Sequence, residues 1–361
     1  MPRSLKSSSD RKSLDEVKSI LYLMQDLSQH QQWLQLHQEE IIDPDRPIID
    51  PHHHLWKTVP GIDPYLLEDL WADTNAGHHI THTVFMECRA EYDTAAPEHL
   101  QSVGETRFVT ELAKKSEHGA GATIAAIIAR TDLRKEVAIV EEAIAAHVEV
   151  SEGRFRGIRQ PLSCAPEGVA LLIPGDAPKD LYADENFRKG VRLLGKMGCT
   201  YDSWHYHFQN KQFLALAQAA PDTQLVLDHF GTPLGVPPYD TQRQEIFETW
   251  KKDIAAIAKC ENVVAKIGGL AMPDNGFGWF GRATPPSSDE FAAAQAPYYH
   301  HTIECFGPDR CMFESNFPVD KLSISYPVLW NGLKKIAARY SEAEQDALFR
   351  GTASRVYRLA I

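Results

Sequence analysis

The stretch "PIIDPHHHLWK", residues 47–57, joins a short apolar run to three consecutive histidines. A run of this kind is typical of a strand buried on both faces, as in a parallel sheet. Side chains two residues apart share a face of a strand. We therefore predict that His52 and His54 point together, above Asp50, and that His53 points to the opposite side. An H-x-H pair at a strand end can chelate a divalent metal, or supply a base and an oxyanion-stabilising cation; taken alone, it is also compatible with surface or capping histidines.

Seven more short apolar runs follow along the chain, most of them separated by a helical pattern. They predict strands within residues 80–93, 122–131, 155–162, 199–207, 223–231, 262–270 and 310–318. Eight strand–helix units indicate a (β/α)₈ TIM barrel of the α/β class. An open doubly wound sheet is the alternative, although no G-x-G-x-x-G motif follows the first strand. In a barrel, the long loops 161–184 and 271–290 would lie at the C-terminal face, where active sites form.

Residues 1–46 precede the predicted barrel, which we assign to residues 47–361. Apolar residues recur at three- and four-residue spacing from Leu14 to about Ile42. This spacing predicts an N-terminal helical extension of one or two amphipathic helices behind a polar tail. Such a helix could pack on the outside of the barrel or form the contact of a homodimer.

The composition bounds the partners and the compartment. The 361 residues are 43% apolar and 24% charged, with a formal net charge of −12. An acidic surface argues against nucleic acid or an anionic membrane as partner, and leaves a small-molecule substrate. The six cysteines form no C-x-x-C pair, and no apolar run reaches the roughly 18 residues that cross a bilayer. We therefore expect a cytoplasmic protein with reduced thiols.

Polar and aromatic residues gather at the predicted C-terminal ends of the strands. The candidates for substrate contact are Glu87, Arg89, Arg159, Trp204, His205, His207 and Lys266, and those for catalysis are His229, Glu314 and Asn316 together with the H-x-H pair. Collecting such groups at one end of a barrel is costly without a function. Each residue also has a structural alternative. Arg159 could form an ion pair, His205 or His207 could lie hydrogen-bonded in the core, and Lys266 could extend to solvent.

Six motifs occur in a fixed order: "IDPHHHLW", "FRGIRQ", "LVLDHFG", "NVVAKIGGL", "RCMFESNFPVD" and "GTASRVYRL". With them, residues 47–361 resemble the amidohydrolase superfamily, in the branch of amidohydrolase-related TIM barrels. That branch contains lactonases acting on sugar lactones, pyrone dicarboxylates and sulfomuconolactone. The resemblance implies a barrel enzyme that hydrolyses a small carbonyl compound, and it says little about which one.

The resemblance also implies residue roles. His52, His54 and His229 match the histidines that act in catalysis and that bind a divalent metal, usually zinc, in some members of the superfamily. Other lactonases of the branch work without a metal, so both possibilities stay open. The strand-eight position that is normally the Asp base is Asn316 here, and an amide cannot take a proton from water. Glu314, two residues earlier, could replace it, or a histidine could be the base.

These observations together predict a hydrolase that opens a lactone or a related ester or amide. Arg159, with Arg89, would bind an anionic group of the substrate. The alternatives are a metal-dependent decarboxylase or other lyase of aromatic acids, and a biosynthetic barrel that has lost hydrolysis. Asn316 is the residue that favours the last of these.

Overall fold

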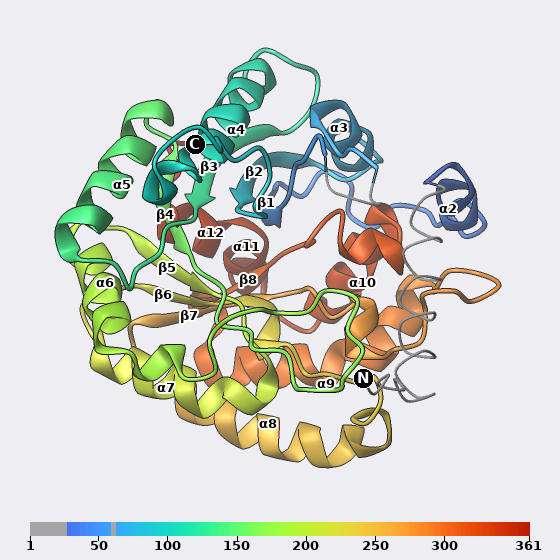
Figure 1. Ribbon diagram of the computed structural model, residues 1–361. Coiled ribbons are helices and arrows are strands. Elements are labelled where there is room, and N and C mark those ends of the chain that lie inside the picture. Colours follow the sequence, from blue (N-terminus) through green and yellow to red (C-terminus); the bar gives the residue numbers. More distant parts are fainter. Residues whose placement is uncertain (1–26, 59–62) are drawn as a thin grey trace, which may run out of the picture.

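The computed structural model describes residues 27–58 and 63–361, and its centre is a parallel barrel inside a ring of helices (Figure 1). The strands pair in chain order, and every neighbouring pair is parallel. They are β1 Ile48–His53, β2 Ile80–Met86, β3 Thr123–Ala129, β4 Phe155–Arg159, β5 Thr200–Ser203, β6 Leu225–Leu227, β7 Val263–Ile267 and β8 Cys311–Phe313. This order confirms the predicted TIM barrel and rules out the open doubly wound sheet.

The barrel closes directly at the histidine triplet. The backbone N–H of Asn316 donates to the carbonyl of His52 at 3.0 Å, and the N–H of His54 donates to the carbonyl of Phe317 at 2.9 Å. The segment that follows β8 is thereby joined to the end of β1. Two of the motifs that lie farthest apart in the sequence thus form one edge of the barrel mouth.

Helices cover the outside of the barrel (Figure 1). They are α3 Leu67–Thr74, α4 Val103–Ser116, α5 Val137–Val150, α6 Glu185–Lys196, α7 Asn210–Ala219, α8 Arg243–Ile257, α9 Ser288–Phe306 and α10 Tyr326–Ala337. Two short helices, α11 Glu342–Asp346 and α12 Thr352–Val356, lie at the centre of the view inside this ring, and α12 packs on the barrel interior. Alternate strand residues fill the interior, among them Ile49, Val84, Met86, Val226, Val264 and Met312, and Tyr357 packs against them. None of the described helices is long and apolar enough to cross a membrane.

The N-terminal helical prediction extends too far. Helix α2, Leu27–Leu34, is present beside the barrel, but the chain is no longer helical beyond residue 36. The following segment is held by the barrel helices instead, because Asn331 of α10 accepts the N–H of Ile42 at 2.9 Å and donates to the carbonyl of Glu40 at 2.9 Å. These tertiary hydrogen bonds override the helical spacing. Residues 14–26 of the predicted helix lie outside the described part of the chain.

Candidate active site

The β1 strand is irregular where it enters the site. Its register with β2 shifts between Asp50 and His53. Ile49 points into the barrel and Asp50 therefore points outward, and the shift after Asp50 brings His52 to the inner side. The buried Asp50 carboxylate accepts hydrogen bonds from the N–H of Ser315 at 3.0 Å and from the hydroxyl of Tyr326 on α10 at 2.9 Å. The prediction that Asp50 shares the face of His52 is therefore wrong. Burial raises the pKa of Asp50 to about 6, and its hydrogen-bond donors limit that rise.

His53 points away from the mouth, as the strand alternation predicts. Its Nε2 lies 3.0 Å from Thr83 Oγ1, and its ring meets the edge of Phe85 in the layer between strand and helices. Burial lowers the pKa of His53 to about 3. This histidine is a neutral core residue with no part in the site.

The H-x-H pair faces the mouth with its two Nε2 atoms only 3.3 Å apart. His54 Nδ1 lies 2.8 Å from the carbonyl oxygen of Met86. A carbonyl only accepts, so Nδ1 must carry the proton and Nε2 must carry the lone pair. Burial, followed by nearby positive charge, lowers the pKa of both His52 and His54 well below the usual value. The pair is neutral; His54 lies on the cavity wall, and His52 Nε2 faces an Arg159 nitrogen at 3.3 Å.

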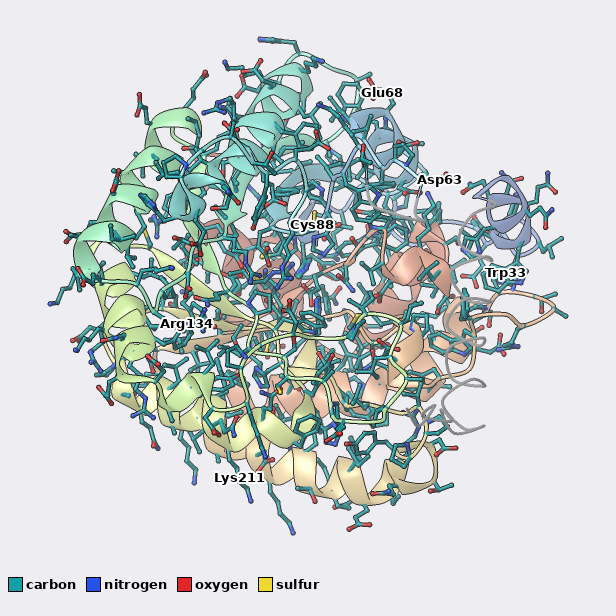
Figure 2. All side chains as sticks on the ribbon, viewed as in Figure 1. Trp33, Asp63, Glu68, Cys88, Arg134 and Lys211 are labelled. Carbon is teal, nitrogen blue, oxygen red and sulfur yellow. The ribbon has the colours of Figure 1, made fainter. Side chains whose placement is uncertain are left out.

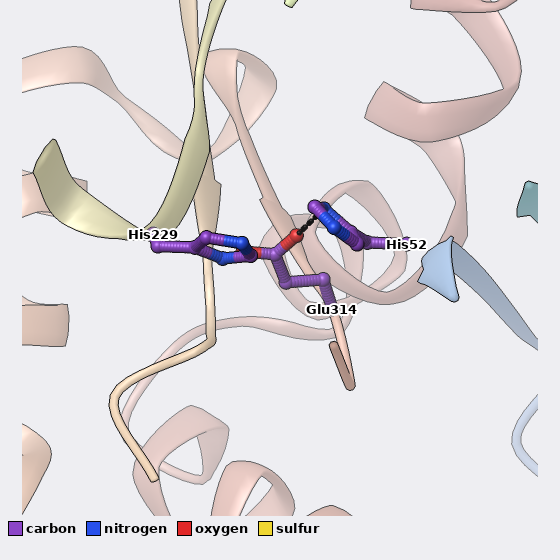
Figure 3. Close-up of side chains that lie close together, drawn as sticks. All are labelled: His52, His229 and Glu314. Carbon is purple, nitrogen blue, oxygen red and sulfur yellow. Dashed lines mark hydrogen bonds and ion pairs between the residues drawn. The ribbon is translucent and has the colours of Figure 1, made fainter. Parts of the chain in front are cut away.

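Glu314 joins two histidines from opposite sides of the mouth (Figure 3). Its Oε1 lies 2.7 Å from His229 Nδ1, and its Oε2 lies 2.8 Å from His52 Nδ1. All three side chains are buried. Each offers one possible metal-ligand atom, and these three atoms lie within 4.8 Å of one another, so the group could hold a metal ion.

These distances indicate which atoms a metal could use. Two ligands of a tetrahedral zinc lie about 3.4 Å apart, given metal–ligand distances of about 2.1 Å. The nitrogen–oxygen separations at Glu314 are shorter than this. His229 Nδ1 donates a hydrogen bond to Glu314 Oε1, whereas His52 Nδ1 and Glu314 Oε2 lie close together without hydrogen-bond geometry. The hydrogen bond orients the His229 ring and leaves its Nε2 for a ligand.

His229 reaches the cavity through an uncommon backbone. β6 ends at Leu227, and His229 and Phe230 then take left-handed φ angles of 53° and 58°. Gly269 makes room for the ring, because a Cβ at that position would lie 2.2 Å from His229 Nδ1. Strained positions held in this way are concentrated at functional sites. Burial lowers the pKa of His229 to about 3, so this imidazole is also neutral.

Arg159 lies beside the H-x-H pair and is tied to acidic groups. Its Nε donates to Glu87 Oε1 at 3.0 Å, a second nitrogen donates to the Glu87 carbonyl, and Nη1 lies 3.3 Å from His52 Nε2. Asp228 Oδ2 is 3.9 Å away. Burial alone would lower the pKa of Arg159, but the carboxylates of Glu87 and Asp228 outweigh it and raise the pKa. The guanidinium stays charged on the cavity wall.

Asn316 sits on the cavity wall with a left-handed φ of 57°. Its amide nitrogen donates to Asp320 Oδ1 at 2.8 Å. The other Asp320 oxygen accepts the N–H of Ala271 at 3.0 Å, so the amide is fixed in place. An amide held in this way can donate or accept hydrogen bonds but cannot serve as the base.

The mouth encloses a cavity of about 250 Å³. Its wall brings together seven of the residues that the sequence singles out, namely His54, Glu87, Arg89, Arg159, Trp204, His229 and Asn316. Ile173, Pro174, Gly175 and Asp176 of the loop 161–184 complete it, as the barrel topology predicts. Glu314 lies beneath the wall and acts through the histidines.

Three predicted substrate residues lie elsewhere. β5 ends at Ser203, so the alternation does not extend to His205, which stacks on Phe213 of α7 and bonds Asn210 Oδ1 at 3.0 Å. His207 Nδ1 accepts the N–H of Leu234 at 3.2 Å, away from the cavity wall. Both positions correct the prediction and match the alternative of a hydrogen-bonded structural histidine.

Lys266 is the third of these residues. It is fully buried below the cavity, with Nζ 2.9 Å from Asp202 Oδ2 and 3.4 Å from Asp228 Oδ1. Burial alone would lower the pKa of Lys266, but the two carboxylates outweigh it and raise the pKa. Lys266 thus neither contacts a cavity ligand nor reaches solvent, contrary to both expectations. The sequence reasoning missed this ion cluster, although Asp228 stands next to His229 in the chain.

The fold and the site define the class: a TIM-barrel enzyme with histidines clustered at the C-terminal ends of its strands. A family model described as amidohydrolase matches residues 49–359, and the chain belongs to this family. The resemblance carried by the sequence motifs is thereby confirmed, and the protein is an amidohydrolase-type enzyme.

Individual relatives cover nearly the whole barrel. The chain is 31% identical over 335 residues to Uncharacterized protein y4mH of Sinorhizobium fredii, spanning 87% of this chain and 99% of that protein. It is 28% identical over 326 residues to L-fucono-1,5-lactonase of Burkholderia multivorans, spanning 86% and 96%. The crystal structure of a Burkholderia multivorans amidohydrolase with bound zinc superimposes with a TM-score of 0.68 at 25% identity, covering 87% of this chain and all of that one.

Proposed function

We propose that the protein hydrolyses a lactone, or a closely related ester, of a small organic acid in the cavity above the H-x-H pair. The observation that carries this proposal is the arrangement of His52, His54 and His229. His54 and His229 line the cavity as neutral imidazoles, His52 lies buried against both rings, and Glu314 accepts a hydrogen bond from His229. The similarity to an L-fucono-1,5-lactonase over nearly its whole length supports a lactone as the substrate class.

The residues also fit a divalent metal, with zinc as the first candidate. The 3.3 Å between His52 Nε2 and His54 Nε2 is close to the roughly 3.4 Å edge of a tetrahedral zinc site. The side chains whose ligand atoms all lie within 4.8 Å of one another are His52, His229 and Glu314, so a metal at this site would draw on Glu314 or bring His54 and His229 closer together. Arg159 would have to give up its contact with His52 Nε2. A bound dication would polarise the substrate carbonyl and lower the pKa of a water molecule. The zinc held by a relative of 25% identity supports this assignment.

We assign the proton transfers to His229 and Glu314. In its ionised form, Glu314 accepts a hydrogen bond from His229 Nδ1–H, which leaves His229 Nε2 free to take a proton from water as the water oxygen attacks the lactone carbonyl. Because burial raises the pKa of Glu314 to about 8, this step needs a pH near or above 8, or a bound dication that favours the carboxylate. The carboxylate stabilises the imidazolium that forms, in the manner of the acidic member of a catalytic triad. Arg159 lies where it can donate to the developing oxyanion. When the ring C–O bond breaks, His229 returns its proton to the leaving alkoxide.

Two substitutions test this proposal on a panel of γ- and δ-lactones. We expect His229→Ala and Arg159→Ala each to lower kcat/KM by about 10²-fold or more, the range seen when one acid–base or oxyanion group is lost. The exposed His118 provides the control, and His118→Ala should leave kcat/KM and the melting temperature unchanged. Full activity in both cavity variants would show that the chemistry occurs elsewhere.

A further inference from the structure

The two arginines on the cavity wall differ in how free they are to bind a substrate. Arg159 is almost fully buried, and its donors already serve Glu87 and His52. A substrate anion would have to compete with Glu87 and with Asp228, both of which are buried carboxylates. Arg159 is thus placed to act at the reacting carbonyl and is poorly placed to select an anionic substituent.

Arg89 is positioned at the mouth by a dedicated backbone clamp. Glu105 Oε1 accepts the N–H of Cys88 at 3.0 Å and the N–H of Ala90 at 2.7 Å, on either side of the arginine. Between these two bonds Arg89 takes a left-handed φ of 62°. A left-handed backbone costs free energy for an arginine, so it persists only where the surrounding contacts hold it in place. Figure 2 shows the neighbouring Cys88 within the ring of helices, at the mouth end of β2.

The Arg89 guanidinium forms an ion pair with a carboxylate of the protein itself, that of Asp176. Nη1 donates to Asp176 Oδ2 and Nη2 donates to Asp176 Oδ1, both at 2.6 Å, which is the bidentate geometry of carboxylate recognition. Asp176 belongs to a cavity rim that is fixed by its own backbone, because Ala177 N–H donates to the Ser163 carbonyl at 3.0 Å. The Asp176 side chain is 64% exposed and that of Arg89 is 45% exposed.

We propose that Arg89 is the specificity-determining residue that selects substrates carrying a carboxylate, and that Asp176 is a built-in competitor for the same guanidinium. This inference rests on the proposed lactone hydrolysis and assigns its substrate class. An exposed ion pair contributes little to stability, so a substrate carboxylate can replace Asp176 at small cost. Water then solvates the released Asp176 side chain, and the bound substrate keeps its carbonyl near His229 and Arg159.

A matched pair of substrates tests the assignment: a γ-lactone with a ring carboxylate, 5-oxotetrahydrofuran-2-carboxylate, and its neutral carboxamide. We expect Arg89→Met to lower kcat/KM about tenfold to a hundredfold on the carboxylate, and less than about threefold on the carboxamide. Asp176→Asn should lower KM for the carboxylate alone, because the competing charge is gone. Equal losses on both lactones in Arg89→Met, or no loss on either, would overturn the assignment.

The control is another arginine with a bidentate aspartate partner. Arg134 binds Asp132 through Nε and Nη2 on the part of the surface away from the cavity. Arg134→Met removes a comparable surface ion pair, so it should change neither KM nor the preference between the two lactones. A change of preference in this variant would show that surface charge in general, and not Arg89, makes the selection.

A binding measurement separates failure of this inference from failure of the proposed function. If the wild-type protein opens neither lactone, the proposed function fails for this class, while calorimetry with glutarate and its neutral diamide still tests Arg89. We expect glutarate to bind more tightly than the diamide, and Arg89→Met to abolish the difference. Equal binding of the two compounds by the wild-type protein, or no glutarate binding at millimolar concentration, would overturn the role of Arg89.

Discussion

Glu314 holds the Nδ1 atoms of His52 and His229 from one buried position, at 2.8 and 2.7 Å. Glutamine in its place keeps the size but can accept through only one of its two terminal atoms. We expect Glu314→Gln to lower zinc affinity and kcat/KM by about 10- to 100-fold, as for other carboxylates that orient ligating histidines. Metal titration and steady-state kinetics measure the two effects. Glu304→Gln, on the exposed face of α9, is the control; equal behaviour of the two variants would contradict the role of Glu314.

The same carboxyl predicts a pH dependence of metal binding. Burial raises the pKa of Glu314 to about 8 in the metal-free protein, so its neutral form prevails below that pH. A dication at the Nε2 atoms favours the ionised carboxylate, and binding must then expel one proton. Zinc affinity should therefore fall by about tenfold for each unit of pH below 8. His229 adds no proton there, because its pKa is already about 3.

Competition with a chelator at several pH values checks this slope. Glu314→Gln should flatten the dependence, because no group that titrates near pH 8 then remains at the Nδ1 side of the rings. A steeper slope in the wild-type protein, or the same slope in the variant, would assign the proton to another group.

At the residue scale, strand alternation predicts part of the site and fails where regular strand ends. It places His52 and His54 together and His53 apart, because β1 runs through residue 53. It fails at His205, because β5 stops at Ser203 and the chain turns before the histidine. The register shift after Asp50, which brings His52 to the inner side, cannot be recognised in the alternation of the sequence.

At the element scale, Asp50 holds the closure of the barrel between β1 and β8. It accepts hydrogen bonds from the N–H of Ser315, the N–H of His52 and the hydroxyl of Tyr326. Asp50→Ala leaves three buried donors without a partner, and each costs about 1–3 kcal/mol. We expect the free energy of unfolding to fall by about 3 kcal/mol or more in urea denaturation.

Tyr326→Phe is the matched variant for this prediction, because it removes one donor and leaves the Asp50 carboxylate its two backbone partners. It should cost about 1 kcal/mol. If Asp50→Ala were no less stable than Tyr326→Phe, the carboxylate would not be what joins the two strands.

Local sequence signals explain which helices were predictable. At α9, Ser288–Phe306, Ser287 and Glu290 form a capping box at the start of a long helix. α3 carries a weaker signal, because its eight residues give only about two turns. The prediction for the N-terminal segment ran past α2, because hydrogen bonds to Asn331, far along the chain, decide its path.

At the scale of the whole molecule, a buried ion cluster lies below the histidines. Lys266 neutralises Asp202 and Asp228, and Tyr357 from the end of the chain donates to Asp202 Oδ2 at 2.6 Å. Lys266→Met leaves the buried Asp202 without its cation and Asp228 with only the 3.9 Å contact to Arg159, and breaking such a buried pair costs about 3–5 kcal/mol. We therefore expect a lower melting temperature with little change in KM. If the variant had a changed KM and unaltered stability, Lys266 would be a substrate-binding residue and the structural role would be contradicted.

The sequence could predict only which strand ends contribute residues to the site. Barrel topology places such ends on one face, and this made His54, Arg159 and His229 candidates. It gives no side-chain distances, so the bridge from Glu314 to His229, 85 residues apart, and the clamp of Glu105 on Arg89 became visible only in the folded chain.

The most direct test of the central claim is the ring opening of lactones in water labelled with heavy oxygen. Mass spectrometry would follow the hydroxy acid formed by the wild-type protein and by His229→Ala. The account predicts enzyme-dependent incorporation of one labelled oxygen into the product carboxylate, at a rate that falls at least about 10²-fold in the variant. Loss of carbon dioxide from aromatic acids, or a product without the label, would contradict hydrolysis and favour a lyase or a biosynthetic barrel.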